Sequence, residues 1–162
     1  MKDILIQPGS YFACGSETTA RIHCNTACNV VLAFLDVTTQ SVVVGNILLP
    51  FSSISKQSVS ENSVLYADTA VPFLLNAILE QRSLGEGRDF DVIMVGGSDA
   101  GEKMSLPDMG SRNIEEIENQ FKRYNLFPTA SYVGGSIQRK VIVDTQKMKT
   151  YIKSSGKEDI MI

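Results

Sequence analysis

Reactive side chains concentrate in one stretch near the amino terminus. Residues 21–36 contain the only histidine of the chain, His23, and two of its three cysteines, Cys24 and Cys28. These residues directly precede an apolar run, residues 30–35, that is typical of a buried strand. A thiol has an ordinary pKa of about 8.5, so it becomes a nucleophile at neutral pH only beside a base or a positive charge. A cysteine near an imidazole is therefore the first candidate for catalytic chemistry.

The spacing decides whether the two groups could meet. In a continuous strand, positions 23 and 28 face opposite sides, because successive side chains alternate. His23 and Cys28 could meet only if residues 25–27 bend the chain. Asn46 could orient a partner by hydrogen bonding, but an amide cannot act as a general base. A Cys28–His23 pair is thus one interpretation, and small thiols packed near a core strand are the other.

A metal site is a weaker interpretation of the same residues. His23, Cys24 and Cys28 would supply three ligands, whereas structural zinc takes four. The paired Cys-x-x-Cys spacing is absent, and Cys14 is the only other thiol. We therefore expect no metal and no other cofactor.

Two glycine pairs, Gly96-Gly97 and Gly134-Gly135, each follow an apolar strand. Neither pair belongs to a phosphate-binding loop or a dinucleotide fingerprint, so nucleotide binding has little support. The pairs indicate turns that need positive φ, or a rim where the backbone of a partner approaches. Arg112 and Arg139 lie near these pairs and are candidate binding residues, with solvation at the surface as the alternative.

The elements that must position these residues follow from hydrophobic periodicity. One helix should begin close to Asp68 and end at Gly85 and Gly87. A second helix should be capped by Asn113, with Glu116 completing a capping box. Strands are expected within residues 18–24 and over residues 30–35, 41–49, 90–95, 130–133, 141–144 and 149–153. Strands first, helices in the middle and strands at the end predict an α+β fold with a mixed sheet.

The composition is that of an ordinary globular domain. The 162 residues are 43% hydrophobic and 20% charged, which suits a single domain with its own core. We expect that core to span about residues 4–153 and residues 154–162 to form a loose tail. The net charge of −3 gives no reason to expect nucleic acid as a partner. Residues 1–20 have no signal-peptide pattern and no apolar run could span a bilayer, so cytosol is the expected compartment.

Four motifs occur in one order along residues 4–153. They are Tyr66-Ala-Asp-Thr-Ala70 at the start of a helix, Gly96-Gly97 after a strand, Met109-Gly-Ser-Arg-Asn113 before the second helix, and Gly134-Gly135 with Arg139. Together they resemble the chemoreceptor glutamine deamidase family, CheD. The resemblance implies an α+β sandwich shared with the cytotoxic necrotizing factor deamidases. It also implies hydrolysis of glutamine side-chain amides on chemoreceptors by a Cys–His–Thr constellation, and the CheC phosphatase as a further partner.

The sequence departs from the family where the chemistry resides. The family carries Gly-Ser-Cys before its buried strand and a histidine shortly before Leu-Pro. Here the first stretch is Ala27-Cys28-Asn29, and Asn46 stands at the histidine position. An alignment without gaps puts Asn29 at the nucleophile and His23 at the threonine. A one-residue bulge after Cys28 would return that thiol to the nucleophile position.

Two hypotheses follow from this departure. In the favoured one, the chain binds chemoreceptors, a CheC-type phosphatase or both, and its deamidase activity is doubtful. In the alternative, it is an active deamidase in which Cys28 attacks the carboxamide, His23 transfers protons and Asn46 orients the imidazole.

Overall fold

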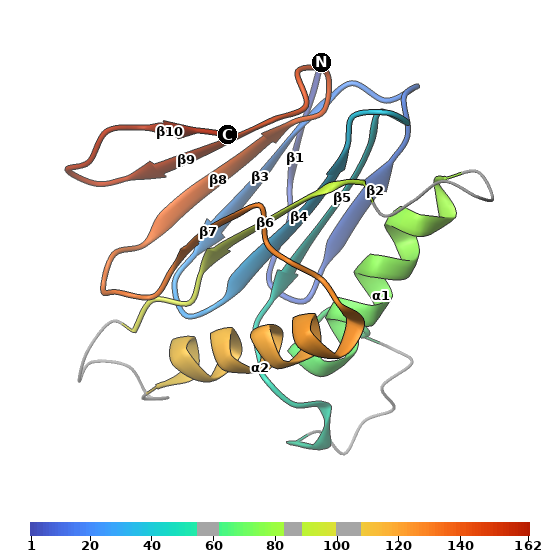
Figure 1. Ribbon diagram of the computed structural model, residues 1–162. Helices are drawn as coiled ribbons and strands as arrows, with labels where there is room; N and C mark the ends of the chain where they lie inside the picture. Colours follow the sequence, from blue (N-terminus) through green and yellow to red (C-terminus); the bar gives the residue numbers. More distant parts are fainter. Residues whose placement is uncertain (55–61, 83–88, 100–107) are drawn as a thin grey trace.

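The computed structural model describes residues 1–54, 62–82, 89–99 and 108–162. They form three layers: two five-stranded sheets face each other, and two helices cover the free face of one sheet (Figure 1). We call the sheet that contacts the helices the central sheet and the other the outer sheet. Both sheets are mixed, because β1 pairs with β3 and β6 with β7 in parallel, whereas the other pairs are antiparallel. The predicted α+β sandwich with two main helices is confirmed.

The outer sheet has the strand order β1-β3-β8-β9-β10. Its strands are β1 (Lys2–Leu5), β3 (Ala20–Thr26), β8 (Arg139–Asp144), β9 (Lys149–Ser154) and β10 (Ile160–Met161).

The central sheet has the order β2-β5-β4-β6-β7. Its strands are β2 (Tyr11–Cys14), β4 (Val30–Asp36), β5 (Ser41–Ile47), β6 (Asp91–Gly96) and β7 (Ala130–Val133). The helices are α1 (Ala67–Glu80) and α2 (Met109–Tyr124), together with a short 3₁₀ helix, η1 (Ser52–Ile54).

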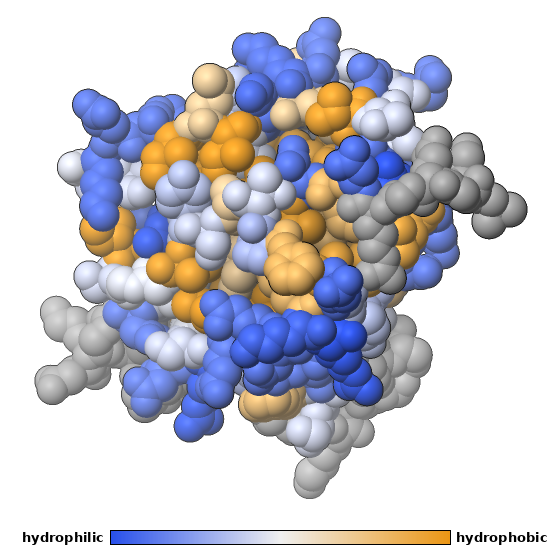
Figure 2. Space-filling view, viewed as in Figure 1, coloured by the Kyte–Doolittle hydropathy of each residue, from blue (hydrophilic) through white to orange (hydrophobic). Residues whose placement is uncertain are grey.

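The central sheet is buried on both faces because each face meets a different layer. Along β4, Leu32 and Phe34 pack with the helices, whereas Val31 and Ala33 pack against the outer sheet. All seven residues of β4 are buried, as the uninterrupted apolar run predicted. Helix α2 packs on the core through one apolar stripe. Its opposite side forms a hydrophilic band across the lower part of Figure 2.

The start of α2 differs from the prediction. The helix begins at Met109, so Asn113 lies in its second turn and is fully buried. The carboxylate of Asp99 caps the helix instead, accepting the N–H of Gly110 at 2.9 Å and the hydroxyl of Ser111 at 2.5 Å. The prediction that Asn113 caps this helix was therefore wrong. A negative charge suits this position because the amino end of a helix carries a partial positive charge.

The carboxyl-terminal segment also differs from the prediction. Ile160–Met161 pairs with β9 as β10, and the backbones of Ile162 and Thr150 exchange two hydrogen bonds. The segment after residue 153 is thus joined to the outer sheet and is not a loose tail. The predicted helix end at Gly85 and Gly87 lies outside the described residues. No helix in the described ranges is long and apolar enough to cross a membrane.

Candidate functional site

The connection between β3 and β4 carries the chain from the outer sheet to the central sheet. It consists of residues 27–29 rather than 25–27, because β3 continues to Thr26. The side chain of Asn29 closes this turn: Oδ1 accepts the N–H of Ala27 at 2.7 Å, and Nδ2 donates to the carbonyl of Asn25 at 2.9 Å. A side-chain amide that bonds to nearby backbone is a common device for fixing a turn.

Asn29 reaches a second asparagine across the sheet. Its Nδ2 also donates to Oδ1 of Asn46 at 2.6 Å, and this bond is buried. Asn46 is itself fully buried and donates from Nδ2 to the carbonyl of Ile6 at 3.2 Å. Its backbone further bonds to Gly9 and Ser10. Asn46 therefore ties the β1–β2 connection to β5, and the two amides use their hydrogen-bonding groups on each other and on backbone.

The register of the central sheet explains which side chains meet. Val31 stands opposite Asn46, and the pairing of β4 with β5 runs without a bulge through all seven residues of β4. Val31 packs between the two sheets, so Asn46 projects into that layer, and so does Asn29, which lies two residues before Val31. Cys28 immediately precedes Asn29, so we expect its side chain to point away from the layer between the sheets that Asn29 enters. The described β4–β5 pairing contains no bulge that would move Cys28 into the position of Asn29.

Cys28 lies half-buried beside the start of α2. Its carbonyl accepts Nδ2 of Asn113 at 2.9 Å. Burial raises the pKa of the Cys28 thiol above its ordinary value. The negative charge of Asp99 adds to this rise, and hydrogen bonds from the backbone of Cys28 and Asn29 oppose it only in part. The site thus favours the thiol over the thiolate, the opposite of what a nucleophile needs.

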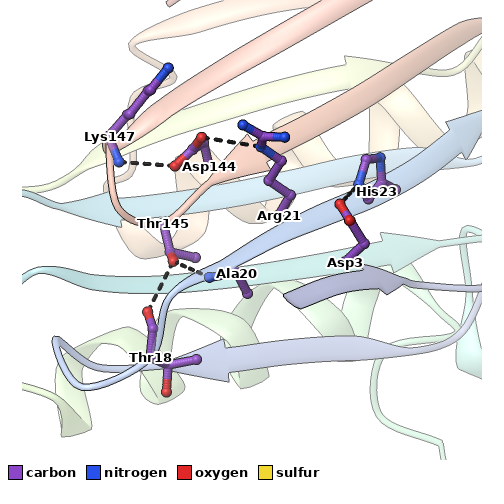
Figure 3. Close-up of polar contacts among 8 residues, drawn as sticks. All are labelled: Asp3, Thr18, Ala20, Arg21, His23, Asp144, Thr145 and Lys147. Atoms are coloured by element: carbon purple, nitrogen blue, oxygen red, sulfur yellow. Dashed lines mark hydrogen bonds and ion pairs between the residues drawn. The ribbon is translucent and has the colours of Figure 1, made fainter. Parts of the chain in front are cut away.

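His23 lies on the solvent-facing side of the outer sheet. Its neighbours along β3, Ile22 and Cys24, are the residues that point into the core. The Nε2 atom of His23 contacts Oδ1 of Asp3 on β1 at 2.7 Å (Figure 3). This contact lowers the pKa of the Asp3 carboxyl. In the described part of the chain no hydrogen bond joins His23 to Cys28, so the structure does not bring the predicted pair together.

The metal interpretation has the same difficulty. Cys24 is a core residue, and burial raises the pKa of its thiol to about 12. His23 projects from the other face of the same strand, so the two side chains cannot share an ion. Within the described ranges, no three His, Cys, Asp or Glu side chains are grouped so that they could hold one.

The two glycine pairs lie side by side at one rim. The N–H of Gly97 donates to the carbonyl of Asn29 at 2.9 Å, and the N–H of Gly134 donates to the carbonyl of Gly96 at 2.9 Å. Gly96 has a φ of +122°, and a Cβ there would collide with the carbonyl of Asn29. Gly135 has a φ of +73°, and a Cβ there would meet no heavy atom of the described residues within 4 Å. The rim therefore joins the β3–β4 turn, the end of β6 and the end of β7.

The two predicted arginines border this rim in different ways. Arg139, at the start of β8, donates from Nη2 to the carbonyl of Gly134 at 3.0 Å. Arg112 is exposed in the first turns of α2. That helix end lies against the rim, because a Cβ on Gly97 would come within 2.6 Å of the side chain of Ile114.

Two residues of the site were not anticipated as site residues. Asn113 donates from Nδ2 to the carbonyls of both Cys28 and Leu48, each at 2.9 Å, and so clamps the turn and the end of β5 to α2. Asp99 holds the amino end of α2 and acts on the Cys28 thiol. The sequence signal that could have identified Asn113 was the position of a polar asparagine on the inner side of an amphipathic helix. No sequence signal links Asp99 to Gly110.

Comparison with known proteins decides the family. The family described as CheD, chemotactic sensory transduction, matches residues 48–154. This chain belongs to the CheD family. It is 27% identical over 120 residues to a probable chemoreceptor glutamine deamidase CheD of Oceanobacillus iheyensis, covering 72% of this chain and 70% of the relative. A protein of the same description from Geobacillus kaustophilus is 28% identical over 122 residues, covering 70% and 69%. One from Methanococcus vannielii is 30% identical over 113 residues, covering 68% and 70%.

The matched region separates the two sets of predicted CheD residues. The rim residues, from Gly96 to Arg139, lie inside residues 48–154, whereas His23, Cys28, Asn29 and Asn46 lie before residue 48. The family match therefore includes the rim and α2 but not the β3–β4 turn.

Proposed function

We propose that this CheD-family protein acts in chemotaxis by binding a chemoreceptor cytoplasmic domain, a CheC-type phosphatase or both, without deamidating glutamine. The observation that carries the proposal is the buried 2.6 Å hydrogen bond between the side-chain amides of Asn29 and Asn46. In the alignment without gaps, these two residues occupy the positions of the family's nucleophile and base. An amide pair fills the place of a thiol–imidazole pair.

Deamidation needs groups that this amide pair lacks. A nucleophile must attack the carboxamide carbon, a base must take the proton of the nucleophile, and the departing ammonia must receive a proton. A side-chain amide can donate and accept hydrogen bonds but supplies neither the nucleophile nor the base. The alternative, in which Cys28 attacks with His23 as base, requires His23 to leave Asp3 and reach a thiol whose pKa is raised.

The rim is the proposed binding surface. It comprises Gly96, Gly97, Gly134 and Gly135 together with Arg112 and Arg139, all within the region that matches the family. Gly96 and Gly97 are buried and shape the rim by packing against Asn29 and α2. Gly134 is partly exposed and Gly135 is exposed, so close approach by a partner is expected at this second pair. The exposed Arg112 adds a charged, multidentate hydrogen-bond donor at the edge of this surface.

Calorimetric titration with a chemoreceptor cytoplasmic domain and, separately, with a CheC-type phosphatase tests the proposal. We expect binding to at least one of them, weaker binding by Arg112→Gln, and unchanged binding by Cys28→Ala. Arg123→Gln is the matched control, because Arg123 is exposed on the same helix at its other end. Absence of binding to both partners at micromolar concentrations, or equal effects of the two arginine substitutions, contradicts the proposal.

A further inference from the structure

An apolar groove of about 450 Å³ lies between the carboxyl end of α2 and β7, at the open edge of the central sheet. Its buried floor includes Met94, Phe121 and Leu126, and its exposed wall includes Phe127 and Ser131. Phe127 is 77% exposed, more than any other large hydrophobic side chain among the described residues. Figure 2 shows apolar surface directly above the hydrophilic band of α2. We call this groove the edge groove.

From the edge groove we infer that the protein binds an extended segment of another protein. The segment adds to β7 as a further strand, places a large apolar side chain in the edge groove and directs an acidic side chain at Lys122. The inference does not rest on the proposed function, because none of the rim residues lines the edge groove.

The first argument is the unpaired side of β7. Among the described strands, β7 pairs only with β6, so the backbone N–H and C=O groups on its other side meet no strand. Native edge strands are commonly protected by charged side chains, proline or a bulge. Residues 130–133 contain no charged residue and no proline, and their register with β6 is regular. The main chain of β7 therefore selects an extended segment as the occupant.

The second argument is the direction in which the side chains of that segment would point. Met94 of β6 and Ser131 of β7 are direct partners, and both line the edge groove beneath α2. Side chains directly opposite each other in neighbouring strands share one face of the sheet. The residue of an added strand beside Ser131 would thus also point toward α2. Because Ser131 is small, the space over the buried floor stays open for a large apolar side chain.

The third argument is the charge at the mouth of the edge groove. Glu118 and Lys122 line it one helical turn apart, and both are exposed. Neither forms an ion pair with a described residue. A carboxylate directed at Lys122 and away from Glu118 complements this pair, and such complementarity fixes the partner and its orientation. The β7 of a second copy, Ala-Ser-Tyr-Val, has no acidic residue, so we infer a different protein.

Selection of a displayed library of random heptapeptides against the intact protein tests the inference. We expect the enriched peptides to share a large apolar residue and an acidic residue. The most enriched peptide is then synthesised and titrated by calorimetry. Ser131→Arg should weaken its binding at least about tenfold by filling the edge groove, and Phe127→Ser should also weaken it. Ser155→Arg is the matched control, because Ser155 is exposed after β9 and outside the edge groove.

Two further measurements separate strand addition from apolar contact alone. N-methylation of alternate peptide residues should abolish binding, whereas N-methylation of the residues between them should not, because only every second residue of a strand bonds to one neighbour. Lys122→Glu should weaken binding of the acidic peptide at least about threefold. A peptide with lysine in place of the acidic residue should bind Lys122→Glu better than it binds the wild-type protein.

Any of five results would overturn the inference. The first three are the absence of enriched peptides, an equal loss of affinity in Ser155→Arg, and binding that no N-methylation affects. The fourth is the absence of rescue by the lysine peptide. The fifth is self-association of the protein, measured by analytical ultracentrifugation without peptide, that Ser131→Arg abolishes, since this result assigns the edge to a second copy.

Discussion

Removing the side chain of Asn46 should cost far more stability than removing an exposed asparagine. Asn46→Ala deletes two buried hydrogen bonds, one to Asn29 and one to the carbonyl of Ile6. Each such bond contributes about 1 kcal/mol net, and each buried group left without its partner adds a penalty of about 1–3 kcal/mol. One hydrogen of Asn29 Nδ2 and the Ile6 carbonyl are left in this way, although relaxation recovers part of the penalty. We therefore expect a loss of about 3 kcal/mol in the free energy of unfolding.

Equilibrium urea denaturation of the single and double variants measures this loss and the coupling of the pair. Asn29→Ala, Asn46→Ala and the double variant form a mutant cycle, and the shared bond predicts a coupling energy of about 1 kcal/mol. Asn76→Ala is the control, because Asn76 is exposed on α1 and its side chain donates to Glu80 at the surface. Its effect should stay within about 0.5 kcal/mol. The reasoning is refuted if Asn46→Ala costs no more than this control, or if the two buried asparagines show no coupling.

Three further predictions concern the surroundings of the pair. Because the pKa of the Cys28 thiol is raised, iodoacetamide should modify Cys28 more slowly at neutral pH than it modifies an ordinary thiol. The rate of modification should increase as pH rises, and rapid modification at neutral pH would indicate an activated thiolate. Gly96→Ala should destabilise the protein by at least about 1 kcal/mol more than Gly135→Ala, since both have positive φ but only Gly96 faces a carbonyl; thermal unfolding compares them, and equal effects contradict the rim geometry. Asn113→Ala should cost about 2 kcal/mol through its bonds to Cys28 and Leu48; urea unfolding checks this, and a neutral effect excludes the clamp.

The fold could be predicted where burial leaves a strong pattern. The strand at β4 was evident because its apolar residues run without interruption, and the stripe of α1 was evident because one face of that helix is buried. By contrast, β10 was not predicted. It is a short segment in a polar stretch, and its strand conformation comes from pairing with Tyr151 and Ile152 of β9. A single sequence does not display such tertiary pairing.

The candidate site shows the same division between local and distant information. Alternation along a strand indicates that residues 23 and 28 face different ways, and the structure gives His23 and Cys28 different neighbours. The capping role of Asp99 could not be found in this way, because it acts on Gly110, eleven residues further on. Asn113 looked like a local cap, but its amide bonds to the carbonyls of Leu48 and Cys28, which are 65 and 85 residues away in the chain.

The most direct test of the account is a deamidation assay on the expected target. A chemoreceptor cytoplasmic fragment is incubated with the protein, and each receptor glutamine is examined by mass spectrometry for conversion to glutamate. A CheD relative that retains the family's cysteine and histidine is the positive control. The proposed function assigns the bonded amides of Asn29 and Asn46 to the positions of nucleophile and base, so we predict no conversion above that in a sample without protein. Conversion by the wild-type chain that disappears in Cys28→Ala would contradict the account.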